Sequence, residues 1–447
     1  MIKGIVIFFA LLSGGIAYVS GWGQTDEELS GSSRKWLNLS ETGTPNEAFL
    51  FLFGIAAPEN EAPIRWGKMR LAQYHALLEQ GTEPGRDLTG SAQPADPEHK
   101  DTSEGLFPGQ RTAAKEIELP QGGYFCSRRE PDCITRLLAI TADDMKQLGE
   151  ENRALRERVQ QFLMFDSYRT TALPDIQEPF DYLFYLSAGL RLELLGAIAL
   201  YNTDQPGPAV HALLDLLART RKHLKLQDTF LGRAVVASNM ADTLDILALI
   251  SSRSVPEGLT VDQLTVEERD VRRIAAREFR GHYRLLRKMD RNPGFFAEDE
   301  PVPGWYVRLL FKPNMTANAM APVYDRLAEL SLMEHAAFAE AIKVPLKPET
   351  TPWISNYAGN ILLNTGSEDL RKYVGLLLDL NLKIYLFNHR GADPASLSNP
   401  YYPGQPPKRT AQTICMDGPY EDPRQIRCIP VTVAAGTGQS ASSGSAP

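Results

Sequence analysis

Apolar side chains recur three and four residues apart along most of the chain, the spacing that places them on one face of a helix. Met145, Leu148, Leu155, Val159 and Phe162 follow it within one long stretch. Alternating apolar and polar positions, which would favour strands, are scarce. The pattern predicts helices over residues 47–53, 63–80, 134–165, 180–201, 208–224, 228–250, 267–289, 317–342 and 368–388. Thr141 or Asp143 could restart a helix inside the third of these.

These helices favour a mainly α protein, an irregular α-helical bundle that follows an N-terminal membrane anchor or signal. The stretch from Leu192 to Leu217 resembles one helix-turn-helix unit of a tetratricopeptide array, with Gly196, Tyr201 and Ala209 at matching positions. A true array would repeat the unit about every 34 residues, and no second copy occurs at that period. The bundle is therefore the preferred interpretation.

Composition divides the chain into segments. Residues 82–123 are rich in Gly, Pro, Asp and Ser and nearly free of large apolar side chains, so they cannot bury enough surface to offset their ordering entropy. The end of the chain is of similarly low complexity. We expect a leader, a tether with a small helical segment, a flexible linker, an α-helical main domain and a disordered tail at 1–21, 22–81, 82–123, 124–430 and 431–447.

The first residues have the pattern of an export signal or a signal-anchor. Lys3 is followed by an almost wholly apolar stretch from Gly4 to Val19, and the next charge is Asp26. Spanning a bilayer takes about 20 residues, so this stretch is close to the lower limit. Tyr18 and Trp22 suit the aromatic residues that flank a membrane span.

Three interpretations of this leader remain open. As an uncleaved anchor, residues 4–21 would cross the inner membrane once, with the bulk of the chain in the periplasm. Cleavage before Trp22, with Val19 and Gly21 as the small residues at the cleavage site, would instead leave a soluble periplasmic protein. The third possibility is a buried core helix of a cytosolic protein.

Four cysteines occur as two close pairs, in FCSRREPDC and in CMDGPYEDPRQIRC. Export would place them in an oxidising compartment, where we expect Cys126 to pair with Cys133 and Cys415 with Cys428. A zinc site usually has two closer C-x-x-C pairs, and a redox-active pair also has the C-x-x-C spacing. The spacing thus favours two structural disulfides over both alternatives.

Four segments occur in a characteristic order: AFLFLFGIAAPENEAPIRWG, the FCSRREPDC pair, LLFKPNMTANAMA and RKYVGLLLDLNLKIYLFNHRG. In this order the four segments resemble a group of exported proteobacterial proteins of about this length, which carry no established activity. The resemblance implies an envelope-located, helical protein stapled by cysteines. It supplies no catalytic residue.

Charge and motifs exclude several function classes. The net charge of −8 makes nucleic acid an unlikely partner for the chain as a whole. The sequence lacks G-x-S-x-G, G-x-x-x-x-G-K-[ST], G-x-G-x-x-G and H-E-x-x-H. We therefore expect no cofactor and no metal site.

Two sets of polar residues remain as candidates. Glu278 and His282 lie four residues apart on one expected helix, so they would be neighbours as a surface ion pair or as a catalytic acid–base pair. Asn314 and Asn318 would cap a helix or bind a ligand, and Asn239 with Asp242 interrupts an apolar helix where each would need a partner.

The preferred functional hypothesis is a non-enzymatic envelope protein that binds a protein or a cell-wall-associated partner. It rests on the anchor, the tether, the helical body and the missing catalytic motifs. The first alternative is an envelope hydrolase or transferase that uses Glu278 and His282 or the Asn314 segment. The second is a secreted toxin or its inhibitor.

Overall fold

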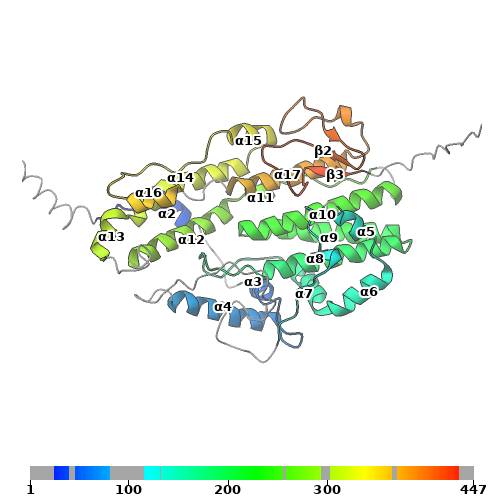
Figure 1. The fold of residues 1–447 in the computed structure, drawn as a ribbon, viewed down its shortest axis with the longest axis horizontal. Helices are drawn as coiled ribbons and strands as arrows, with labels where there is room; N and C mark the ends of the chain where they lie inside the picture. Colours follow the sequence, from blue (N-terminus) through cyan, green and yellow to red (C-terminus); the bar gives the residue numbers. More distant parts are fainter. Residues whose placement is uncertain are drawn as a thin grey trace, which may run out of the picture.

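The computed structural model describes residues 25–39, 46–80, 115–130, 132–254, 258–292, 303–364 and 370–431. It is a mainly helical, irregular bundle, as predicted (Figure 1). The helices are α2 (Gly31–Asn38), α3 (Glu47–Phe53), α4 (Pro63–Gln80), α5 (Cys133–Leu138), α6 (Ala142–Glu151), α7 (Arg153–Met164), α8 (Tyr182–Asn202), α9 (Pro206–Leu226), α10 (Phe230–Ser254), α11 (Val266–Arg269), α12 (Arg272–Arg291), α13 (Gly304–Leu310), α14 (Pro313–Ser331), α15 (His335–Ala341), α16 (Tyr357–Leu363) and α17 (Leu370–Asn388). The described residues also include two 3₁₀ turns, η2 (Gly123–Phe125) and η4 (Pro394–Ser396).

The longest helix expected from the sequence is divided into α5, α6 and α7. Thr141 starts α6 through a capping box, in which its hydroxyl accepts from the Asp144 amide and the Asp144 carboxylate accepts from the Thr141 amide. Asn152 then ends α6 and precedes α7. The expected helices 267–289 and 317–342 are divided in the same way, into α11 and α12 and into α14 and α15.

A small antiparallel sheet near the end of the described chain was not predicted. Its strands, in the order β1-β2-β3, are β1 (Lys408–Arg409), β2 (Thr413–Cys415) and β3 (Cys428–Pro430). Cys415 lies directly opposite Cys428 in the register. Strands of two or three residues are too short to show an alternating pattern, which is why the sequence does not predict them.

The main core lies between α8, α9 and α10, with α7 against α8 and α17 against the other side of α10 (Figure 1). Residues 48–53 of α3 join this core and are all buried. Tyr182–Asn202 and Phe230–Ser251 are long and apolar enough to cross a membrane. However, 67% and 83% of the residues in their apolar 18-residue stretches are buried inside the fold. Such burial is the ordinary situation of core helices in a globular body.

A second, smaller core joins α2 to α12 and α14. Trp36 is almost completely buried, and its ring centroid lies 6.2 Å from that of Tyr324. Phe279 meets the same tyrosine edge-on at 5.3 Å. Helix α2, in the segment expected to be a tether with a small helical segment, thus packs against the body.

The end of the expected linker also lies against the body. The Ile117 amide donates to the Ala56 carbonyl, and the Tyr185 hydroxyl donates to the Ile117 carbonyl. Residues 1–24, 81–114 and 432–447, which carry the expectations for the leader, most of the linker and the tail, lie outside the described residues.

Candidate functional site

A groove of about 750 Å³ runs between α6, α7 and α8. Small residues of α8, among them Gly196, Ala197 and Ala199, form its floor. Charged residues of α6 and α7 line its walls. The break at Asn152, where α6 ends and α7 begins, lets the two helices run in different directions along the groove. The lining residues are Ala142, Met145, Lys146, Gly149, Glu150, Arg153, Arg156, Glu157, Gln160, Glu193, Gly196, Ala197, Ala199, Leu200, Thr203 and Ala212.

Charges of both signs surround the groove. Lys146, Glu150, Arg153 and Glu157 are exposed along its rim. At the wall, Glu193 accepts from the Arg156 Nε at 2.6 Å and from the Gln160 Nε2 at 2.9 Å. None of these described lining residues is aromatic, so the groove differs from the mostly apolar pockets that enclose small ligands. Its small-residue floor and charged rim suit polar contacts with a ligand that carries charges of both signs.

A buried ionic network connects the first disulfide loop to the core. The structure pairs Cys126 with Cys133, as predicted. Arg128, inside that loop, reaches Asp242 at 3.1 Å and also bonds Asp245, both on α10. Arg191 of α8 bonds the other oxygen of Asp242 at 2.7 Å.

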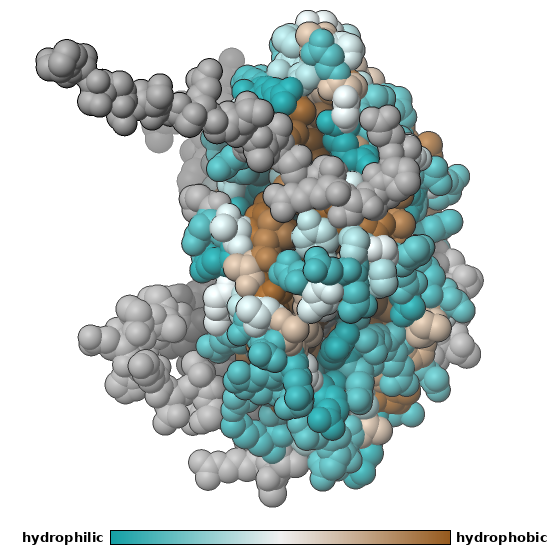
Figure 2. Space-filling view, turned by 90° about the vertical axis from the view of Figure 1, so that its right-hand side faces the viewer, coloured by the Kyte–Doolittle hydropathy of each residue, from teal (hydrophilic) through white to brown (hydrophobic). Residues whose placement is uncertain are grey.

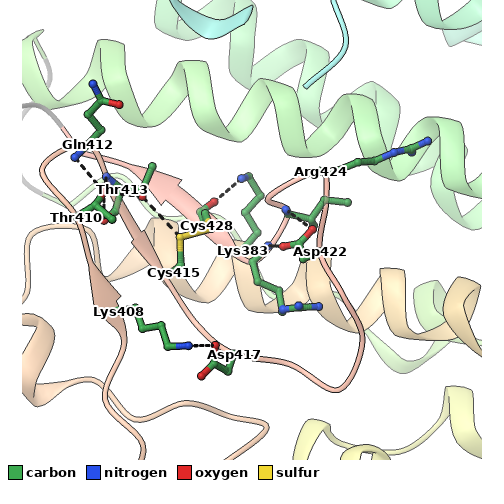
Figure 3. Close-up of a disulfide and its surroundings, with 12 residues drawn as sticks. Lys383, Lys408, Thr410, Gln412, Thr413, Cys415, Asp417, Asp422, Arg424 and Cys428 are labelled. Carbon is green, nitrogen blue, oxygen red and sulfur yellow. Dashed lines mark hydrogen bonds and ion pairs between the residues drawn. A yellow bond between two sulfur atoms is a disulfide. The ribbon is translucent and has the colours of Figure 1, made fainter. Parts of the chain in front are cut away.

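The second disulfide loop reaches the same network from the opposite side. Cys415 is paired with Cys428, again as predicted, and Lys383 of α17 donates to the Cys428 carbonyl at 2.6 Å (Figure 3). The Lys383 ammonium also lies 2.5 Å from Asp245, and both side chains are at most 1% exposed. The two loops touch directly where the Arg128 Nε donates to the Arg424 carbonyl at 3.0 Å.

A neighbouring group fixes the rest of the second loop. Asp379 of α17 accepts from the Tyr401 hydroxyl and from Arg427, each at 2.8 Å. Burial raises the pKa of Asp379 to about 6, against the opposing effect of Arg427. Burial, with the nearby Arg128 guanidinium, holds the pKa of Lys383 well below its usual range. Because these charges are enclosed and paired, the network is suited to holding two loops in place.

Asn239 and Asp242 lie on α10 but have different partners. The Asn239 amide donates to the Ser187 hydroxyl at 3.2 Å and to the Val235 carbonyl at 2.9 Å. Asp242 belongs to the ionic network described above. Asn239 and Asp242 therefore each have the hydrogen-bond partners that a buried polar residue needs, and all of these partners belong to the chain itself.

Glu278 and His282 lie on α12, at its contact with α14. The His282 Nδ1 bonds the hydroxyl of Tyr324, which is buried on α14. Burial raises the pKa of Glu278 and of Tyr324, and lowers that of His282. All three shifts disfavour the charged form of the group concerned, and burial is the first cause of each. Neither residue of the proposed acid–base pair lines the groove.

Asn314 and Asn318 hold the N-terminal segment onto α14. The Asn314 Nδ2 donates to the Glu27 carbonyl at 2.8 Å. The Asn318 side-chain oxygen accepts from the Ser30 amide and the Ser33 hydroxyl, each at 2.8 Å, and its nitrogen donates to Glu27 and to the Glu28 carbonyl. We call this set of contacts the N-terminal latch. The two asparagines thus share no hydrogen-bond partner with Asn239 or Asp242.

Comparison with known proteins adds no relative. Searches of protein-family models, curated proteins and solved structures each found no match for the chain. Within the described ranges, no group of three or more His, Cys, Asp or Glu side chains is placed to hold a metal ion. The groove residues were not singled out from the sequence, where their only signal is a run of mixed charges within the helix expected over 134–165.

Proposed function

We propose that the chain is a membrane-tethered protein of the bacterial envelope that binds a polypeptide partner in the groove between α6, α7 and α8. The observation that carries the proposal is the groove itself, with small residues on its floor and charges of both signs on its rim. A rim of mixed sign suits a polypeptide that carries charges of both signs. A rim of one sign would repel the like charges of such a partner.

Two features support the location. Residues 4–21 are apolar and nearly long enough to cross a bilayer, after the single cation Lys3. Both cysteine pairs are joined as disulfides, which persist in oxidising compartments such as the periplasm. The tether would keep the groove in the periplasm while the chain remains attached to the inner membrane.

Site-specific photocrosslinking in cells tests the groove. A photoreactive residue at Glu157 should give a discrete protein adduct, because its side chain stands exposed on the groove rim. Lys146→Glu combined with Arg153→Glu should abolish the adduct by reversing the rim charge. The matched control, Lys347→Glu with Arg409→Glu, reverses two exposed cations outside the groove and should retain it. An adduct that survives both changes, or fails to form at all, contradicts the proposal.

Fractionation tests the location separately. The full-length protein should sediment with membranes, be digested by protease added to spheroplasts, and resist maleimide until it is reduced. Recovery in the spheroplast interior with four reactive thiols would rule out the proposed compartment while leaving the groove open to a different partner.

A further inference from the structure

Large apolar side chains are exposed on α13 and around the start of α16, two helices that contact each other. Trp305 and Tyr306 are each 47% exposed, Trp353 is 66% and Ile354 is 71% exposed. The rings of Trp353 and Tyr357 meet edge-on at 4.8 Å. We call this surface the aromatic patch; its members are Trp305, Tyr306, Trp353, Ile354, Tyr357 and Ile361.

A buried asparagine joins the two halves of the patch. Asn356, directly before α16, accepts from the Lys312 amide at 2.9 Å and donates to the Thr316 hydroxyl at 3.0 Å. Lys312 lies between the end of α13 and the start of α14. The start of α16, the end of α13 and the start of α14 are therefore fixed at one point, and the aromatic side chains are carried on a rigid base.

The N-terminal segment enters the fold at that same point. The Asp26 carboxylate accepts from the Asn314 amide at 2.7 Å and from the Met315 amide at 3.2 Å, so it caps α14. These amides lie two and three residues beyond Lys312, whose own amide bonds Asn356. Figure 1 shows α2, α13 and α16 gathered at one end of the molecule, on the left of the view.

Chain length limits how far this end can lie from the membrane. If residues 4–21 cross the bilayer, only five peptide links separate residue 21 from Asp26, and they reach at most about 17 Å. The headgroup region on each side of the hydrocarbon core is itself about 5–8 Å thick. The first turn of α14 is therefore held beside the headgroups, and the aromatic patch with it.

We propose that the aromatic patch lies in the headgroup region of the same membrane, so that the lipid–water interface is its ligand. The inference rests on the proposed tether. Trp and Tyr concentrate at this interface because each ring has an apolar body and a polar group that stays hydrated. The opposite end of the molecule, which faces the viewer in Figure 2, is mostly hydrophilic with a narrow apolar strip.

This orientation has a consequence for the groove. In Figure 1, α6 lies toward the end opposite α13 and α16. With the aromatic patch on the membrane, the groove would be displayed away from the bilayer, where a periplasmic polypeptide has free access. The patch would thus set an orientation that attachment through a single span does not set by itself.

Tryptophan quenching by lipids tests the inference on the full-length chain. The protein is reconstituted into phosphatidylcholine–phosphatidylglycerol vesicles that carry a quencher at a shallow acyl position, in a Trp22→Phe background that removes the tryptophan of the leader. Trp305 and Trp353 should be quenched, whereas Trp36 and Trp66, at 1% and 8% exposure, should stay bright. Replacing both Trp305 and Trp353 by Phe should remove the quenchable component.

A charge variant and its control sharpen the result. Trp353→Glu with Ile354→Glu should reduce the quenching of Trp305, since the patch would no longer enter the interface. Val344→Glu, at a site that is 70% exposed but outside the patch, should leave it unchanged. All three substituted side chains are exposed, so circular dichroism should match that of the parent.

The outcomes separate the inference from the proposal beneath it. Protein that fails to float with vesicles has lost the tether, and the inference falls with it. Protein that floats while Trp305 and Trp353 remain unquenched overturns the inference alone. The same holds if crosslinking through the patch shows a second copy of the chain covering it.

Discussion

The two ends of the molecule are fastened by different chemistry. At the disulfide end, the loops 126–133 and 415–428 are closed covalently and joined through Arg128, Asp245 and Lys383. The side chains of Asp245 and Lys383 are at most 1% exposed, and that of Arg128 is 11% exposed. At the other end, the N-terminal latch uses asparagine, serine and carboxylate groups that are partly exposed. Buried charges are strongly destabilising when one partner is lost, whereas exposed hydrogen bonds exchange with water at low cost. The first end is therefore built to stay closed, and the second can open.

The largest effect is expected from Lys383→Met. It leaves Asp245 and the Cys428 carbonyl without the buried ammonium, and breaking such a pair costs about 3–5 kcal/mol in the free energy of unfolding. Lys408→Met is the matched control, because Lys408 is 71% exposed and its pair with Asp417 is worth at most about 1 kcal/mol. Urea unfolding in mild detergent measures both, and equal losses would show that the buried ion pair is no more costly to break than the exposed one.

Removal of the disulfides ranks next. Cys415→Ser with Cys428→Ser should lower the free energy of unfolding by about 3 kcal/mol, and Cys126→Ser with Cys133→Ser by about 2.5 kcal/mol, because the longer loop restrains the unfolded chain more. The measurement is thermal unfolding of each double variant. If the order is reversed, the ionic network rather than loop closure dominates the stability of this end.

The free energy of unfolding should depend on pH through Asp379, at the disulfide end. Its pKa is raised to about 6 in the folded protein from an ordinary value of 3.8, so the folded state binds this proton more tightly than the unfolded state. The stabilisation that comes from this tighter proton binding is full below pH 3.8 and is lost as the pH rises through 6. The free energy of unfolding should therefore fall by about 2 kcal/mol between pH 4 and pH 7.

The test compares the wild type with Asp379→Asn over that range. Asn cannot titrate, so the stability of the wild type relative to the variant should fall as the pH rises. A difference that is constant from pH 4 to pH 7 would mean that Arg427 keeps the carboxylate charged throughout.

The smallest effect is expected at the latch. Asn318→Ala removes hydrogen bonds to the Ser30 amide and the Ser33 hydroxyl, at a cost of about 1 kcal/mol. Amide hydrogen exchange in α2 should accelerate while α10 is unaffected. Asn364→Ala, which removes an exposed side-chain amide that donates to the Asn360 carbonyl, should change neither rate. Global unfolding by Asn318→Ala would show that the latch belongs to the core.

Local features were predictable from the sequence and distant ones were not. The bounds of α3 and α4 agree with the expectation because their signals are local: Asn46 caps the Ala48 amide and Pro63 begins the second helix. The disulfides are local for the same reason. The division at Asn152 was missed because apolar spacing continues across it, although the backbone does not.

The candidate site depends on helix packing, which a pattern along the chain does not contain. The groove exists because the small residues of α8 lie against α6 and α7. These elements are distant in sequence: Arg156 of α7 and its partner Glu193 of α8 are 37 residues apart. Asn314 and Asn318 were recognised as polar residues at a helix start, as the caps of their own helix. Their actual partners come from the N-terminal segment.

The cap that Asp26 places on α14 also dictates an order of assembly. Asp26 and Asn314 are 288 residues apart, so α2 leaves the ribosome long before the helix that will receive it has been synthesised. Contacts so distant in sequence form late, because the closure entropy of the long loop is lost before the contact forms. Until α14 exists, Trp36 lacks its contact with Tyr324, so a nascent chain stalled before residue 313 would leave that side of α2 uncovered.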